Sequence, residues 1–117
     1  MSYRALYNAV IEPQWDMHHK APGIDEPLTT PDTALDLAAV MGANPRLRVL
    51  SLNGLYDMST PFFGTEFDLS HMLLPAGLRK NITIKYYLSG HQTYADPDAL
   101  RLMKADLDQF YGAAAGG

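Results

Sequence analysis

Three stretches of the chain carry the spacing of apolar residues that predicts helices. They cover residues 31–42, 61–74 and 96–111. A Thr-Pro pair opens each of the first two, with Thr30 and Thr60 as the expected N-caps and Pro31 and Pro61 at the first helical position. The third places Leu100, Met103, Leu107 and Phe110 on one face. Each stretch is therefore expected to pack one side against a core.

Two apolar runs rich in β-formers lie between these helices and predict strands over residues 47–53 and 82–88. The apolar character of the first run is too continuous for a half-exposed hairpin, which favours a buried strand there. From residue 31 the order is helix, strand, helix, strand, helix, the pattern of right-handed βαβ units. The sequence therefore predicts an α/β fold with a two-strand parallel sheet and flanking helices.

The length of 117 residues limits the chain to one domain, within which three parts differ in pattern. Residues 1–30 show no sustained period, although apolar residues between Tyr3 and Ile11 have rough helical spacing, compatible with a short helix ended by Pro13. Residues 31–111 hold the βαβ pattern. Residues 112–117, Gly-Ala-Ala-Ala-Gly-Gly, predict a flexible tail.

Composition and charge narrow the classes of partner. Hydrophobic residues make up 47% and charged residues 19%, which is typical of a globular domain. The net charge is −4 and no run concentrates Lys or Arg, so nucleic acids and anionic membranes are poor candidate partners. No apolar run approaches the roughly 20 residues of a membrane span, and residues 1–11 do not resemble a signal peptide. The sequence leaves the compartment open.

Candidate ligands for a metal or cofactor are few. The absence of cysteine excludes disulfides, thiolate nucleophiles and Cys-based zinc sites. His18 and His19 are adjacent, but neighbours in sequence do not face one another on a helix, and no acidic residue stands at helical spacing to complete a site. Trp15 is better explained as a packing anchor. We therefore expect neither a metal nor a cofactor.

An acid and a histidine each follow one of the predicted strands. Asp57 comes after the first strand and a small-residue turn, and His91 follows the second strand in the turn Ser89-Gly90-His91. In α/β enzymes the chemistry lies beyond the carboxyl ends of parallel strands. An aspartate that accepts from one imidazole nitrogen leaves the other free to take a proton from a serine hydroxyl. Alternatively, Asp57 is a turn former and His91 a solvated loop residue.

These residues and their surroundings resemble the C-terminal end of the serine carboxypeptidases, the α/β-hydrolase-fold peptidases of family S10. The matching positions are Asn44-Pro45, Val49 to Gly54, Tyr56-Asp57, Thr60-Pro61, Glu66, His71, Tyr86-Tyr87, Ser89-Gly90-His91, Tyr94, Asp106-Leu107 and Phe110-Tyr111. Trp15-Asp16 and His19 resemble the approach to this block in bacterial carboxypeptidase-related members. The resemblance covers roughly residues 8 to 111. It implies that Asp57 is the triad acid, His91 the general base, and a peptide the substrate of the complete enzyme.

The chain departs from that family at the nucleophile. The family serine sits in a Gly-x-Ser-x-Gly elbow, which does not occur here. The serines present are Ser2, Ser51, Ser59, Ser70 and Ser89. Gln92 also stands where the family commonly has Met. Because an Asp/His pair alone has only water to activate, the isolated chain is predicted to be inactive as a peptidase.

Three interpretations follow. In the first, the chain is the C-terminal part of a serine carboxypeptidase, and the family includes members processed into two chains. It then supplies acid and base to a nucleophile on a missing N-terminal hydrolase segment. In the second, it is a noncatalytic interaction or remnant domain, for which self-association is an alternative to a partner. In the third, it is a small hydrolase that uses His91 with water or with Ser89. His71, on the helix after Asp57, is expected to belong to a packing surface.

Overall fold

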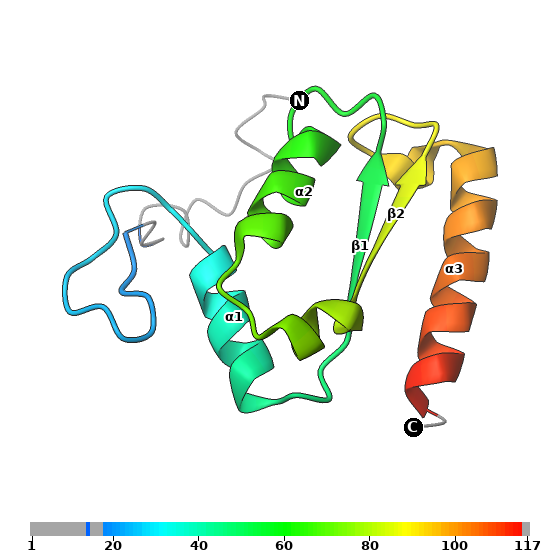
Figure 1. The fold of residues 1–117 in the computed structure, drawn as a ribbon. Helices are drawn as coiled ribbons and strands as arrows, with labels where there is room; N and C mark the ends of the chain where they lie inside the picture. The colour runs from blue at the N-terminus through cyan, green and yellow to red at the C-terminus, as the bar shows by residue number, and fades with distance from the viewer. Residues whose placement is uncertain (1–13, 15–17, 116–117) are drawn as a thin grey trace.

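The computed structural model describes residue 14 and residues 18–115, and it has an α/β architecture built on two strands (Figure 1). In chain order the elements are α1 (Ala34–Ala43), β1 (Val49–Gly54), α2 (Phe62–His71), the 3-10 helix η3 (Ala76–Asn81), β2 (Ile82–Tyr87), the 3-10 helix η4 (Thr93–Ala95) and α3 (Pro97–Ala115). The coarse α/β class is confirmed. The predicted N-terminal helix and the packing of Trp15 lie outside the described residues.

The two strands run parallel, and their side chains alternate between two helices. The register pairs Val49 with Ile82 and Gly54 with Tyr87, so both strands end at the same edge. Tyr86 points to α2, where its ring meets Phe62 edge-on at 5.7 Å between ring centroids. Tyr87 points to the opposite face, where its hydroxyl donates to Asp106 of α3 at 2.8 Å. Figure 1 accordingly shows α2 and α3 on opposite sides of the strand pair.

The first two helices begin later than their Thr-Pro pairs predict. Helix α1 starts at Ala34, because the Asp32 carboxylate accepts from the Ala34 amide at 2.9 Å and holds the preceding residues outside the helix. Helix α2 starts at Phe62, and Pro61 is its N-cap residue in an extended conformation (ψ 135°). Thr60 was therefore wrongly predicted as the N-cap. Its hydroxyl donates to Asp57 instead.

The last helix is longer than the sequence predicts. Helix α3 includes residues 112–115, which we expected in a flexible tail. Alanine is the best helix former, so the three alanines in this segment offset its glycine. At the other end, the Asp96 carboxylate accepts from the Ala99 amide at 2.8 Å and caps the first turn. Within the described part of the chain, no helix combines the length and apolar character needed to cross a membrane.

The interior of the described structure is small. Its buried apolar residues are Ala21, Met41, Met72, Tyr87 and Ala99. Strand β1 is mostly half-buried, with full burial at Asn53 and Gly54, so the expectation that the first strand is buried was wrong over most of its length. One helix per face of a two-strand sheet cannot cover it, and large side chains such as Leu88 and Phe63 are left exposed.

Candidate functional site

The turns after β1 and β2 lie against each other and bring Asp57 to His91. The Leu55 amide donates to the Tyr87 carbonyl and the Tyr56 amide to the Ser89 carbonyl, both at 2.9 Å. These two bonds continue the strand pairing beyond the sheet. As a result, two residues 34 positions apart in sequence meet, with 3.0 Å between Asp57 Oδ2 and His91 Nδ1.

Gly54 makes this close approach possible. A Cβ atom at position 54 would lie 2.3 Å from the Gly90 carbonyl oxygen and 2.7 Å from that of Ser89. These are backbone atoms, which cannot rotate away as the end of a flexible side chain can. A residue with a side chain at position 54 would therefore push the two turns apart.

The Asp57 carboxylate is held on both oxygens. Oδ1 accepts from the Ser59 amide at 2.8 Å and the Thr60 amide at 2.9 Å, while Oδ2 accepts from the Thr60 hydroxyl at 2.8 Å and from His91. Its side chain is 9% exposed. Hydrogen bonds to the carboxylate outweigh its desolvation and hold the pKa of Asp57 well below its ordinary value. The bond from the Thr60 amide contributes most, followed by those from the His91 ring, the Thr60 hydroxyl and the Ser59 amide. The acid is therefore fixed in position and ionised.

The geometry assigns the tautomer of neutral His91. Because an ionised carboxylate only accepts, His91 donates from Nδ1, which leaves the Nε2 lone pair free. The Thr60 hydroxyl lies 3.4 Å from the same Nδ1 atom. The His91 side chain is 60% exposed, and no described residue forms a hydrogen bond with Nε2. The arrangement suits a general base that takes a proton from a group not contributed by residues 18–115.

None of the serines in residues 18–115 forms a hydrogen bond with His91. Ser89 is 5% exposed and its hydroxyl has no hydrogen-bond partner in the described structure, so it is poorly placed to meet a substrate. The Ser51 hydroxyl accepts from the Asn53 amide group within β1. The Ser70 hydroxyl donates to the Phe67 carbonyl. Ser2 lies outside the described residues.

His71 occupies a different environment from His91. Its Nδ1 atom lies 2.7 Å from the Phe67 carbonyl, which can only accept, so Nδ1 is a donor there. That nitrogen therefore cannot take a proton from Ser70, although the Ser70 hydroxyl is only 3.0 Å away. The ring also stacks on Phe67 with 4.0 Å between centroids. These contacts are those of a helix-surface residue.

A second histidine–aspartate pair, which the sequence analysis did not predict, joins the N-terminal loop to α1. His19 Nε2 lies 2.6 Å from Asp36 Oδ2, across 17 residues. Next to it, His18 Nδ1 donates to the Leu28 carbonyl at 3.0 Å. The two histidines thus have different partners. Across residue 14 and residues 18–115, no three His, Cys, Asp or Glu side chains are grouped to hold a metal ion.

A further polar cluster links β2 to α3 on the face opposite α2. Asp106 accepts from Lys85 and from the Tyr87 hydroxyl, both at 2.8 Å. These bonds lower the pKa of Asp106, and the bond from Lys85 contributes most. The pKa of Tyr87 is raised, mainly by burial of its hydroxyl and to a smaller extent by the hydrogen bond to Asp106. On the other face, a hydrogen bond to Glu66 raises the pKa of Tyr86. Both tyrosines therefore act as hydrogen-bond donors that fasten helices to β2.

Comparison of the chain with protein-family models, with curated proteins and with solved structures found no match.

Proposed function

We propose that the chain is the C-terminal segment of a serine carboxypeptidase-like hydrolase of the α/β-hydrolase fold. Asp57 would be the triad acid and His91 the general base in peptide-bond hydrolysis. The observation that carries the proposal is the 3.0 Å contact between Asp57 Oδ2 and His91 Nδ1, with the carboxylate anchored and Nε2 bonded to no described residue. The motif resemblance around these two turns supplies the reaction class.

The chemistry assigned to the pair is limited to proton transfer. His91 Nε2 would take the proton from a serine hydroxyl as that oxygen attacks the peptide carbonyl, and would then give it to the leaving amine. Asp57 would stabilise the imidazolium and keep the ring oriented. The serine and the oxyanion hole would come from outside these 117 residues, because no Gly-x-Ser-x-Gly elbow occurs in them. The chain alone would therefore not hydrolyse peptides.

The first experiment treats the purified chain with a fluorophosphonate and measures its intact mass. We expect a folded protein by circular dichroism and no adduct, since none of the described serines is bonded to His91. A stoichiometric adduct that disappears in His91→Ala would contradict the proposal that the nucleophile lies outside this chain, because one of the five serines would then be activated.

The second experiment supplies the nucleophile. The chain is co-expressed with the N-terminal portion of a serine carboxypeptidase that carries the elbow serine and ends before its own triad acid. In the resulting complex, His91→Ala should abolish hydrolysis of a blocked dipeptide, while the matched His71→Ala should mainly change stability. Equal loss of activity in both folded variants would contradict the assignment. A stable complex without hydrolysis would favour the noncatalytic interaction domain.

The tautomer provides a test that needs no partner. At about pH 9, where an ordinary imidazole is neutral, long-range ¹H–¹⁵N spectra should show His91 protonated at Nδ1. Asp57→Asn removes the acceptor charge and should shift the ring towards the Nε2-protonated form. An Nε2-protonated His91 in the unmodified chain would contradict the proposed base, because its outward nitrogen would have no free lone pair.

A further inference from the structure

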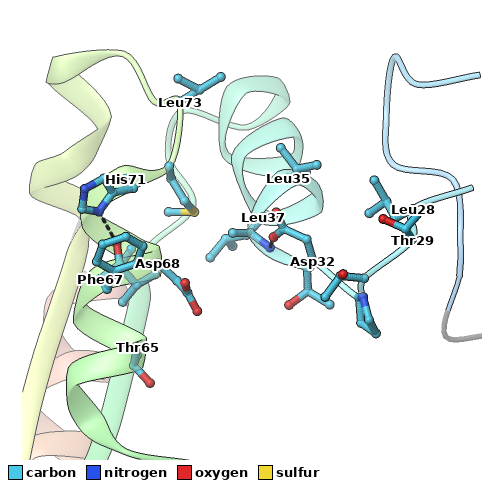
Figure 2. Close-up of a pocket in the computed structure, with 16 residues that line it drawn as sticks. Leu28, Thr29, Asp32, Leu35, Leu37, Thr65, Phe67, Asp68, His71 and Leu73 are labelled. Carbon is cyan, nitrogen blue, oxygen red and sulfur yellow. Dashed lines mark hydrogen bonds between the residues drawn. The ribbon is translucent and has the colours of Figure 1, made fainter.

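A groove of about 870 Å³ separates α1 from α2, away from the Asp57–His91 site. The loop from Leu28 to Thr33 forms part of its wall. Figure 2 shows Thr65, Phe67, Asp68 and His71 of α2 across the gap from Asp32, Leu35 and Leu37. We call this feature the α1–α2 groove and define it by Leu28, Asp32, Leu35, Leu37, Phe67, Asp68, Met72 and Leu73.

The lining of the α1–α2 groove combines apolar surface with one sign of formal charge. Two of its large apolar side chains are strongly exposed, Phe67 at 53% and Leu73 at 88%. Asp32 and Asp68 stand on opposite walls, and no Lys or Arg among the described residues lines the groove. The Asp68 carboxylate has no hydrogen bond or ion pair with any described residue, and Asp32 accepts only from the Ala34 amide. Over the residues that the structure describes, the groove is thus apolar, and the two acids on its walls face no cation.

A second cavity has mainly basic residues in its lining, so the negative charge of the α1–α2 groove is local. It holds about 460 Å³ between the sheet and α3, and it is lined by Arg48, Lys80 and Lys85 against one acid, Asp106. That acid is already paired with Lys85. A generally acidic chain would not by itself give the two cavities opposite charge, so a ligand that prefers one of them by charge should avoid the other.

We propose that the α1–α2 groove is a docking site for a basic amphipathic helix from a partner protein. A gap bounded by two helices suits a third, whose apolar side chains would cover Phe67 and Leu73. Lysines or arginines along the flanks of that helix would face Asp32 and Asp68, and this charge complementarity selects the partner class. The proposal does not depend on the activity of the Asp57–His91 pair.

The test uses two synthetic helical peptides of about 14 residues, since shorter helices are marginal in water. One has a leucine face and lysine flanks, and the other carries glutamate at every lysine position. Fluorescence anisotropy with the full chain should give saturable binding of the Leu/Lys peptide and binding at least about tenfold weaker for the Leu/Glu peptide, an estimate from the cost of placing like charges together. Added salt should weaken the first interaction.

Variants locate the site. Asp68→Lys should weaken Leu/Lys binding by about tenfold or more, whereas Asp98→Lys, an equal charge change on exposed α3, should leave it unchanged. Phe67→Ser should also weaken it, and circular dichroism checks that each variant is folded. Three results would overturn the proposal: no binding of either peptide, equal binding of both, or binding that survives both Asp68→Lys and Phe67→Ser.

Discussion

Two histidine–aspartate pairs in the described part of the chain hold their imidazole rings in opposite ways. Asp57 contacts Nδ1 of His91, and Asp36 contacts Nε2 of His19. Neutral His91 is therefore protonated at Nδ1 and neutral His19 at Nε2, since each carboxylate can only accept. Only the His91 arrangement leaves Nε2 free, as the acid–base pair of a serine triad requires.

The two acids also differ in how they are held. Asp57 follows a strand and receives two backbone amides and a hydroxyl besides His91, with 9% of its side chain exposed. Asp36 lies on α1 with 37% of its side chain exposed, and among the described residues only His19 bonds to its carboxylate. Identical residue types thus form a firmly anchored pair in one place and a partly exposed pair in the other.

The strongest way to break the Asp57–His91 pair is to separate the two turns. Gly54→Val would place side-chain atoms against the Gly90 and Ser89 carbonyl oxygens, and overpacking of this kind costs about 1–3 kcal/mol or more. Urea unfolding should show that loss, and the His91 tautomer should no longer be fixed. The matched Gly64→Ala, in α2 with open space around it, should stabilise the chain by about 0.5–1 kcal/mol. Tolerance of Gly54→Val would contradict the described approach of the turns.

Removing the charge of Asp57 should change the pH dependence of stability. The folded-state pKa of Asp57 lies below its ordinary value of 3.8, so folding favours the ionised form. That contribution is complete above about pH 5 and is lost as the pH falls through the ordinary value towards the folded one. Asp57→Asn should therefore be less stable than the parent at pH 7, and the difference should shrink towards pH 3. Urea unfolding at several pH values measures it, and a constant difference would contradict this prediction.

A smaller effect is expected when one donor to Asp57 is removed. Thr60→Val deletes the hydroxyl that donates to Oδ2 but keeps the backbone amide that donates to Oδ1. The pKa of Asp57 should rise towards its ordinary value without reaching it, because the amide of Thr60 has the largest effect. A ¹³C titration of the Asp57 carboxyl group would measure the change. A variant with the parent's titration curve would show that the hydroxyl contributes nothing.

The smallest effect is expected at the second pair. Asp36→Asn should change the free energy of unfolding by less than about 1 kcal/mol, because partly exposed pairs of this kind contribute little. His19→Ala serves as the partner control, and the double variant gives their coupling. If Asp36→Asn lowered the free energy of unfolding as much as Asp57→Asn, the two acids would not differ in how firmly they are held.

Much of the secondary structure could be predicted from the sequence, with errors where side chains compete for backbone groups. The α/β order was correct because apolar periodicity reports which side of each element packs. The helix starts were wrong because Asp32 and Thr60 make other hydrogen bonds, which no local pattern distinguishes from capping. The burial of β1 was overestimated because burial depends on how many neighbours cover a strand.

In the Asp57–His91 site, too, some features could be predicted from the sequence and others could not. The order of residues alone shows that an acid and a histidine each follow a strand-like run, and that no Gly-x-Ser-x-Gly elbow accompanies them. The parallel pairing of the strands, the nitrogen of His91 that contacts Asp57, the role of Gly54 in that contact and the pairing of His19 with Asp36 are set by the folded chain. Those features depend on distances between residues far apart in the chain, which are set when the turns and helices pack together.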